Sequence, residues 1–169
     1  LTACIQNEAE DFEVVIKSFL ALSEYKTTQA WEALRQTLAK NSRANVRQRL
    51  IDVLGKARYL PAVPEIEQAL GPGEDFQTRR AAVKALVTLQ GSVCIPSITR
   101  ILTEPNQTDL QLLVIEQLDE MEDPGALKPM CKAMIEIADE DVRAAVATMR
   151  DMIRQPGHHH SRQSSHEGG

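Results

Sequence analysis

The chain has 169 residues, a formal net charge of −5, 43% apolar residues and 25% charged residues, which is the composition of one ordinary globular domain. Aromatic residues make up only 4%, which disfavours an aromatic platform that stacks nucleic-acid bases, and the negative charge gives no overall attraction to phosphate. The three cysteines form neither a disulfide framework nor a CxxC zinc pair. No run approaches about 18 apolar residues, so no transmembrane helix is predicted.

One segment recurs with a period of 32 residues, at 46–70, 78–102 and 110–134. Five columns of this repeat hold mainly apolar residues: Leu22, Leu54, Leu86 and Leu118; Phe19, Ile51, Val83 and Ile115; Ser18, Leu50, Ala82, Val114 and Val146; Leu34, Ile66, Ile98 and Met130; and Leu38, Leu70, Leu102 and Met134. A fixed period of about 20–50 residues is typical of solenoids.

The first helical pair follows a polar lead-in over residues 1–10. Apolar spacing predicts a helix that begins near Asp11 and a second helix over about 29–40. The next pair begins after Asn41 and Ser42, which offer N-cap side chains. Pro64 suits the first position of its second helix, which ends at Leu70 before a Gly-Pro-Gly break.

Two further pairs are predicted over about 76–103 and 108–137, and a last helix over about 141–154. In that last helix, Ala147 and Arg150 replace large apolar residues of the repeat, as the outer face of a terminal cap requires. Residues 155–169 are rich in Pro, Gly, Ser and His, a composition typical of a disordered tail. The predicted domains are therefore a lead-in (1–10), a repeat domain (11–154) and a tail (155–169).

The repeats resemble HEAT repeats, particularly the short bacterial type named after phycobilisome lyases, whose motif is roughly DxxVRxxAxxALGxxxDPxAxPxLxxxL. Residues 141–145 (DVRAA) match its opening, 54–55 (LG) its middle and 123–127 (DPGAL) its turn. The resemblance covers about 12–154. It implies an all-α, right-handed α-solenoid of about four helical hairpins plus a capping helix.

The resemblance also implies that the second helix of each pair lies on the concave side of the solenoid. We therefore predict a protein or peptide partner on that side. The residues expected to line it are Glu32, Arg35, Gln36, Glu67, Gln68, Thr99, Arg100, Lys128 and Lys132. Their charge runs from mixed to basic along the chain, which favours a partner with an acidic segment.

A column of Arg47, Arg79, Gln111 and Arg143 follows the start of each first helix. We interpret it as structural, with side chains that bond carbonyls or acids of the adjacent repeat. A basic cluster suits phosphate instead, and nucleic-acid binding is the less favoured interpretation. The cluster consists of Arg43, Arg47, Arg49, Lys56, Arg58, Arg79, Arg80 and Lys84.

Catalysis has little support in this sequence. All four histidines, His158, His159, His160 and His166, lie in the tail, so the repeats hold no histidine base or ligand. No nucleotide-loop or hydrolase motif occurs. We predict a scaffold without catalytic residues, cofactor or metal, and a phycobilin lyase-like, chromophore-handling subunit is the rival interpretation.

Three other groups of residues leave alternatives open. Acidic residues of the fourth pair form either a docking patch for a basic partner or a solvated face: Glu116, Asp119, Glu120, Glu122 and Asp123. Cys94 is expected to be buried and Cys131 accessible. Residues 1–4 (LTAC) resemble the end of a lipoprotein signal, so a lipid anchor on Cys4 is the alternative to a cytoplasmic location.

Overall fold

A computed structural model describes residues 27–136 and 140–154, together with Val14, Lys17, Ser18, Ala21, Glu24 and Tyr25. Most of the helix predicted to begin near Asp11 lies outside the described residues, as do Cys4 and the four histidines. Every element of the described part is helical.

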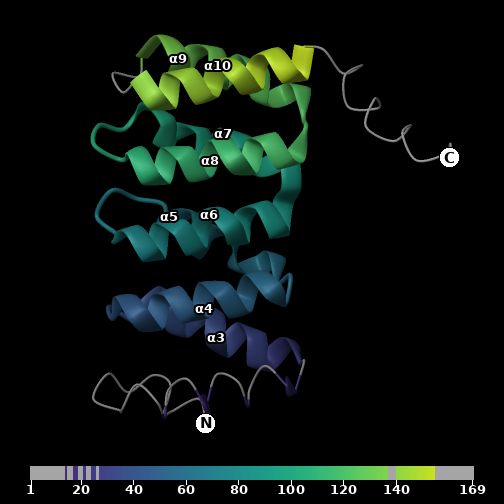
Figure 1. Ribbon diagram of the computed structural model, residues 1–169. Helices are drawn as coiled ribbons and strands as arrows, with labels where there is room; N and C mark the ends of the chain where they lie inside the picture. Colours follow the sequence, from purple (N-terminus) through teal and green to yellow (C-terminus); the bar gives the residue numbers. More distant parts are fainter. Residues whose placement is uncertain are drawn as a thin grey trace, which may run out of the picture. The chain divides into compact units, whose positions relative to one another are not determined.

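The repeat period of 32 residues follows from the residues at which the helices begin. Figure 1 labels the α-helices. The α-helices are α3 (Thr28–Lys40), α4 (Ala44–Lys56), α5 (Val63–Gln68), α6 (Phe76–Gln90), α7 (Ile95–Thr99), α8 (Thr108–Met121), α9 (Leu127–Glu136) and α10 (Glu140–Arg154). The 3₁₀ helices are η1 (Leu60–Ala62), η2 (Gly91–Cys94), η3 (Arg100–Thr103) and η4 (Pro124–Ala126). Helices α4, α6, α8 and α10 each begin 32 residues after the one before, which confirms the predicted all-α solenoid class of fold.

The chain divides into two compact units, Leu1–Ile98 (unit 1) and Thr99–Gly169 (unit 2). The division falls near the end of α7, one residue before η3 begins. The predicted limits of the repeat domain, 11 and 154, stay a prediction.

The core of unit 1 is formed by residues of the predicted columns. These residues lie on one side of each helix, because positions three and four apart in sequence share one side. Leu34 and Leu38 of α3, and Leu50, Ile51 and Leu54 of α4, are fully buried. The equivalent residues of α6 are also buried, and α4 and α6 lie side by side (Figure 1). Burial of this kind stabilises the fold by about 1.5–3 kcal/mol for each large side chain.

Unit 2 has a core of the same kind. Leu118 of α8, Met130 of α9 and Val146 of α10 are fully buried, and α10 contacts both α8 and α9. Ala147 and Arg150 are half-buried. Polar and small residues therefore replace buried apolar ones on α10, as predicted for a cap.

The predicted N-cap of α4 was wrong. The N-cap position is Arg43, whose side chain makes no capping bond. Asn41 instead ends α3: its backbone N–H donates to Thr37 O at 2.9 Å, and its Oδ1 accepts from the Arg43 N–H at 2.9 Å. Asn41 is therefore the C-cap of α3, and it lies too far before Ala44 to be the N-cap of α4.

Two of the second helices, α5 and α7, are short, and 3₁₀ helices adjoin both of them. Helix α5 ends at Gln68 rather than Leu70, and Pro64 occupies its second position rather than its first. Helix α7 has 5 residues, between η2 and η3. Side chains in a 3₁₀ segment advance by a third of a turn per residue, so they leave the register of a longer α-helix.

Phe76–Thr103 is long and apolar enough to cross a membrane, judged by length and composition alone over the described residues. The prediction of no transmembrane helix did not include this stretch, because polar residues interrupt its apolar run. In the structure Gly91, at φ 54°, ends α6, and η2, α7 and η3 follow. Ala82, Val83 and Leu86 are packed in the core. Core helices of soluble proteins pass the same test, so the stretch is weak support for a membrane span.

Candidate interaction face

The residues predicted to line the concave side of unit 1 lie on α3 and α5, which contact each other. We call this surface the second-helix face of unit 1; it comprises Glu32, Arg35, Gln36, Glu65, Glu67 and Gln68. Gln36 and Gln68 are exposed, and the four charged residues are half-buried. The structure therefore brings the predicted residues of unit 1 together, and it adds Glu65.

Arg35 joins the two helices of this face. Its Nε donates to Glu32 Oε2 at 2.9 Å, and a second guanidinium nitrogen pairs with Glu32 Oε1. A third nitrogen reaches Glu65 Oε1 of α5 at 2.8 Å. The Arg35 guanidinium is thus held by two carboxylates, and it is not an unpaired cation that awaits an acidic partner.

Tyr59, in the turn after α4, completes the network by donating its hydroxyl to Glu32 Oε2 at 2.9 Å. The hydrogen bonds from Arg35 and then Tyr59 lower the pKa of Glu32 to about 2. Burial, and then the bond to Glu32, raise the pKa of Tyr59. Glu32 therefore stays a carboxylate near neutral pH and holds no proton for general acid catalysis.

Replacing Glu32 with glutamine should give a stability loss that depends on pH. The pKa of Glu32 is about 2 in the folded chain against an ordinary 4.5. Between these values the unfolded chain binds more protons, so the stability from Glu32 is complete above about pH 4.5 and disappears as pH falls toward 2. Urea unfolding of both proteins at several pH values measures this difference. The interpretation is wrong if the difference is unchanged at low pH, or if a carbon-13 NMR titration places the Glu32 carboxyl near 4.5.

A second bond of the same spacing joins α5 to α7. Ser97 Oγ donates to Glu67 Oε1 at 3.0 Å. Arg35 and Glu67 occupy one column of the repeat, and their partners Glu65 and Ser97 occupy another. The same two columns of the repeat are therefore joined by a hydrogen bond in both places, although the residues differ. This pairing of columns is the sequence signal that could have identified Glu65.

A cavity of about 590 Å³ lies at the outer end of the same face. It is lined by Tyr25, Thr27, Gln29, Ala30, Glu32, Ala33 and Gln36. Two of these, Glu32 and Gln36, were predicted to bind a partner. The lining offers hydroxyl and amide groups that can both donate and accept hydrogen bonds.

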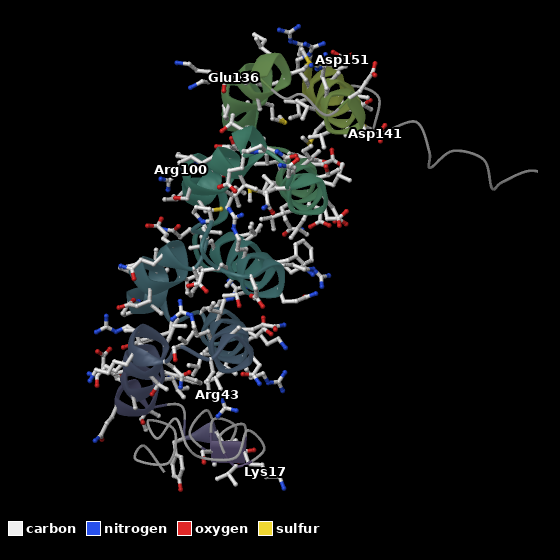
Figure 2. The ribbon with its side chains drawn as sticks, turned by 90° about the vertical axis from the view of Figure 1, so that its left-hand side faces the viewer. Lys17, Arg43, Arg100, Glu136, Asp141 and Asp151 are labelled. Atoms are coloured by element: carbon white, nitrogen blue, oxygen red, sulfur yellow. The ribbon has the colours of Figure 1, made fainter. Side chains whose placement is uncertain are left out.

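The second-helix face of unit 2 is basic. Arg100 of η3 and Lys128 and Lys132 of α9 are exposed, and none of them makes an ion pair with another described residue. Arg100 and Glu136 lie on one side of unit 2, and Asp141 and Asp151 of α10 lie on the other (Figure 2). The exposed cations Arg100, Lys128 and Lys132 therefore share the second-helix face of unit 2 with the acidic Glu136.

Thr99 is a correction to the predicted surface. It is 8% exposed and therefore buried. Thr99 is the last residue of α7, where the chain changes to the 3₁₀ helix η3, and its side chain is too short to extend past its neighbours to solvent. Thr99 thus points inward although its column is partly exposed at Arg35 and Glu67.

The arginine column is structural at the three positions for which bonds are resolved. Arg47 donates to Leu38 O at 2.7 Å and to Glu74 Oε1 at 2.7 Å. The Arg79 Nε donates to Leu70 O at 2.8 Å. In unit 2 the Gln111 amide donates to three carbonyls, at 2.7 Å to that of Glu104, 3.1 Å to that of Leu102 and 3.3 Å to that of Ile101.

These bonds confirm the structural interpretation and reduce the predicted basic cluster. Arg79 is buried and Arg47 is mostly so, which leaves fewer cations for phosphate. Arg143 is exposed on α10. Its column therefore changes environment at the last repeat.

A family model described as HEAT repeats matches residues 31–109. This part of the chain carries HEAT repeats. HEAT repeats are generally protein-interaction scaffolds and are typically not enzymes. The match covers the repeat in general, so the phycobilisome-lyase type stays a prediction. A comparison with curated proteins finds no match to the chain.

The described part of these HEAT repeats offers little for catalysis. It contains no group of three His, Cys, Asp or Glu side chains that could hold a metal ion. Cys94 is buried, as predicted, and burial raises the pKa of its thiol to about 11. The Cys94 thiol is therefore a poor nucleophile near neutral pH. Cys131 is half-buried.

Proposed function

We propose that this chain is a protein-interaction module that holds a partner segment on the faces formed by its second helices. One observation carries the proposal. Polar side chains on successive second helices of unit 1 are fixed by hydrogen bonds from repeat to repeat, through Arg35 to Glu65 and Ser97 to Glu67. Side chains held in place before binding lose less conformational entropy when a partner arrives.

The charges of the two faces support different contacts. In unit 1 the face carries three carboxylates, two of them paired with Arg35 and the third, Glu67, bonded to Ser97, so this face suits hydrogen-bond donors of the partner. In unit 2 the exposed Arg100, Lys128 and Lys132 suit an acidic stretch. The proposed acidic segment of the partner therefore belongs on unit 2.

Arg100→Glu combined with Lys132→Glu tests this proposal. We expect the double variant to lose most of the partner protein that the wild type captures from native lysate at moderate salt, as quantified by mass spectrometry. Both residues are exposed, so stability should change by only about 0.5 kcal/mol or less. Arg80→Glu combined with Lys84→Glu makes the same charge change on α6, away from the second helices, and should leave capture intact.

Three outcomes would contradict the proposal. Equal capture by both double variants would remove the second-helix face of unit 2 as the binding surface. Recovery of nucleic acid alone, with binding that collapses between about 50 and 200 mM salt, would favour a nucleic-acid binder. Recovery of a coloured bilin protein, with a shift in bilin absorption on mixing, would favour the lyase-like alternative.

A further inference from the structure

The outward side of α6, in unit 1, carries a row of cations. Its exposed residues follow helical spacing: Gln77, Arg80, Lys84 and Thr88. Neither Arg80 nor Lys84 makes an ion pair with another described residue. Arg49 and Lys56 are exposed on α4, which packs against α6. We call Gln77, Arg80, Lys84 and Thr88 the basic row.

The same four columns on α8, in unit 2, carry an acidic residue at three positions and an apolar residue at the fourth. They hold Asp109, Leu112, Glu116 and Glu120, all exposed, which we call the acidic row. Lys84 and Glu116 are equivalent positions of the repeat, 32 residues apart. On neighbouring α10, Asp141 and Asp151 also lie on the side away from Arg100 and Glu136 (Figure 2). The repeat thus keeps the exposure of these columns, while the net charge of the row changes from positive on α6 to negative on α8.

Neither row is neutralised within its own helix. Like charges four residues apart repel one another, as at Arg80 and Lys84, or at Glu116 and Glu120. Glu120 also lies in the last turn of α8, which contains no basic residue, so it opposes the helix dipole. A cation placed against the end of α8 would relieve both effects.

We propose that the basic row of one copy of this chain binds the acidic row of a second copy. Arg80 and Lys84 are four residues apart, as are Glu116 and Glu120, so two charge pairs can form between the rows. Each row also has an exposed apolar side chain within or beside it, Phe76 at 40% and Leu112 at 38%. These side chains supply the apolar contact that charge pairs alone lack. A second copy is favoured over another partner because this chain itself carries both complementary surfaces.

Sedimentation velocity of the full chain tests the proposal. At about 100 μM protein and about 20 mM salt, we expect the wild type to sediment faster than one copy, and at about 500 mM salt as a single copy, because salt screens exposed charge pairs. Arg80→Glu/Lys84→Glu makes both rows acidic, and Glu116→Lys/Glu120→Lys makes both rows basic. Each variant alone should remain a single copy at low salt, with an unchanged far-UV circular dichroism spectrum.

An equimolar mixture of the two reversal variants gives the deciding result. One supplies acidic rows and the other basic rows, so the mixture should associate again although neither variant does so alone. Arg100→Glu/Lys132→Glu, on the opposite side of unit 2, should associate like the wild type. A wild type that stays single at low salt would overturn the proposal. So would reversal variants that still associate alone, a mixture that does not, or a basic row that binds only nucleic acid or another acidic protein.

Discussion

Replacing Arg79 with alanine should lower the free energy of unfolding by about 3 kcal/mol. Arg79 is 2% exposed and is the largest fully buried side chain of the described residues. Its Nε donates to Leu70 O at 2.8 Å. Alanine would leave that carbonyl without this donor, at a cost of about 1–3 kcal/mol, and would open a cavity where the side chain packs.

Urea denaturation of Arg79→Ala beside Arg80→Ala measures this effect. Arg80 is the next residue on α6 and is exposed, so its removal should change stability by less than about 0.5 kcal/mol. Arg79→Lys keeps the charge and loses the planar fork of donors, so it should fall between wild type and alanine. If the two alanine variants are equally stable, the bond to Leu70 does not hold α6 to the end of the preceding repeat.

The repeat spacing and the buried columns were predictable because packing uses the same positions in every unit. Leu54, Leu86 and Leu118 are buried at the equivalent position of successive repeats, so selection for burial leaves a visible period in the sequence. The Arg79 position was predictable for the same reason. A long donor after each helix start can reach the carbonyls that end the preceding repeat.

The bonds on the second-helix face were less predictable. Tyr59 reaches Glu32 from a turn, 27 residues away, and no other repeat has an equivalent pair among the described bonds. The burial of Thr99 depends on the 3₁₀ turns around α7. Such details depend on local backbone geometry, which a pattern of apolar residues does not specify.

The close approach of α4 and α6 at Gly55 was not predicted from the sequence, although Gly55 matched the repeat motif. A Cβ added to Gly55 would lie 2.9 Å from the Ala85 Cβ and 3.2 Å from the Ala85 Cα. Gly55→Ala should therefore destabilise the chain by about 1–2 kcal/mol, since an overpacking cost of about 1–3 kcal/mol exceeds the gain of about 1 kcal/mol from replacing a helical glycine.

Gly73→Ala is the matched control, because an added Cβ there meets nothing within 4 Å. Its stability should stay the same or rise by up to about 1 kcal/mol, through a less flexible unfolded chain. Ala85→Gly alone should cost about 1 kcal/mol in helix propensity. Adding Gly55→Ala to Ala85→Gly should then cost less than Gly55→Ala does in the wild type, because the contact at 2.9 Å with the Ala85 Cβ is gone and only the contact at 3.2 Å with the Cα of residue 85 remains. If Gly55→Ala costs the same with and without Ala85→Gly, the glycine is not required for the approach of α4 to α6, and its effect must come from the backbone of α4 alone.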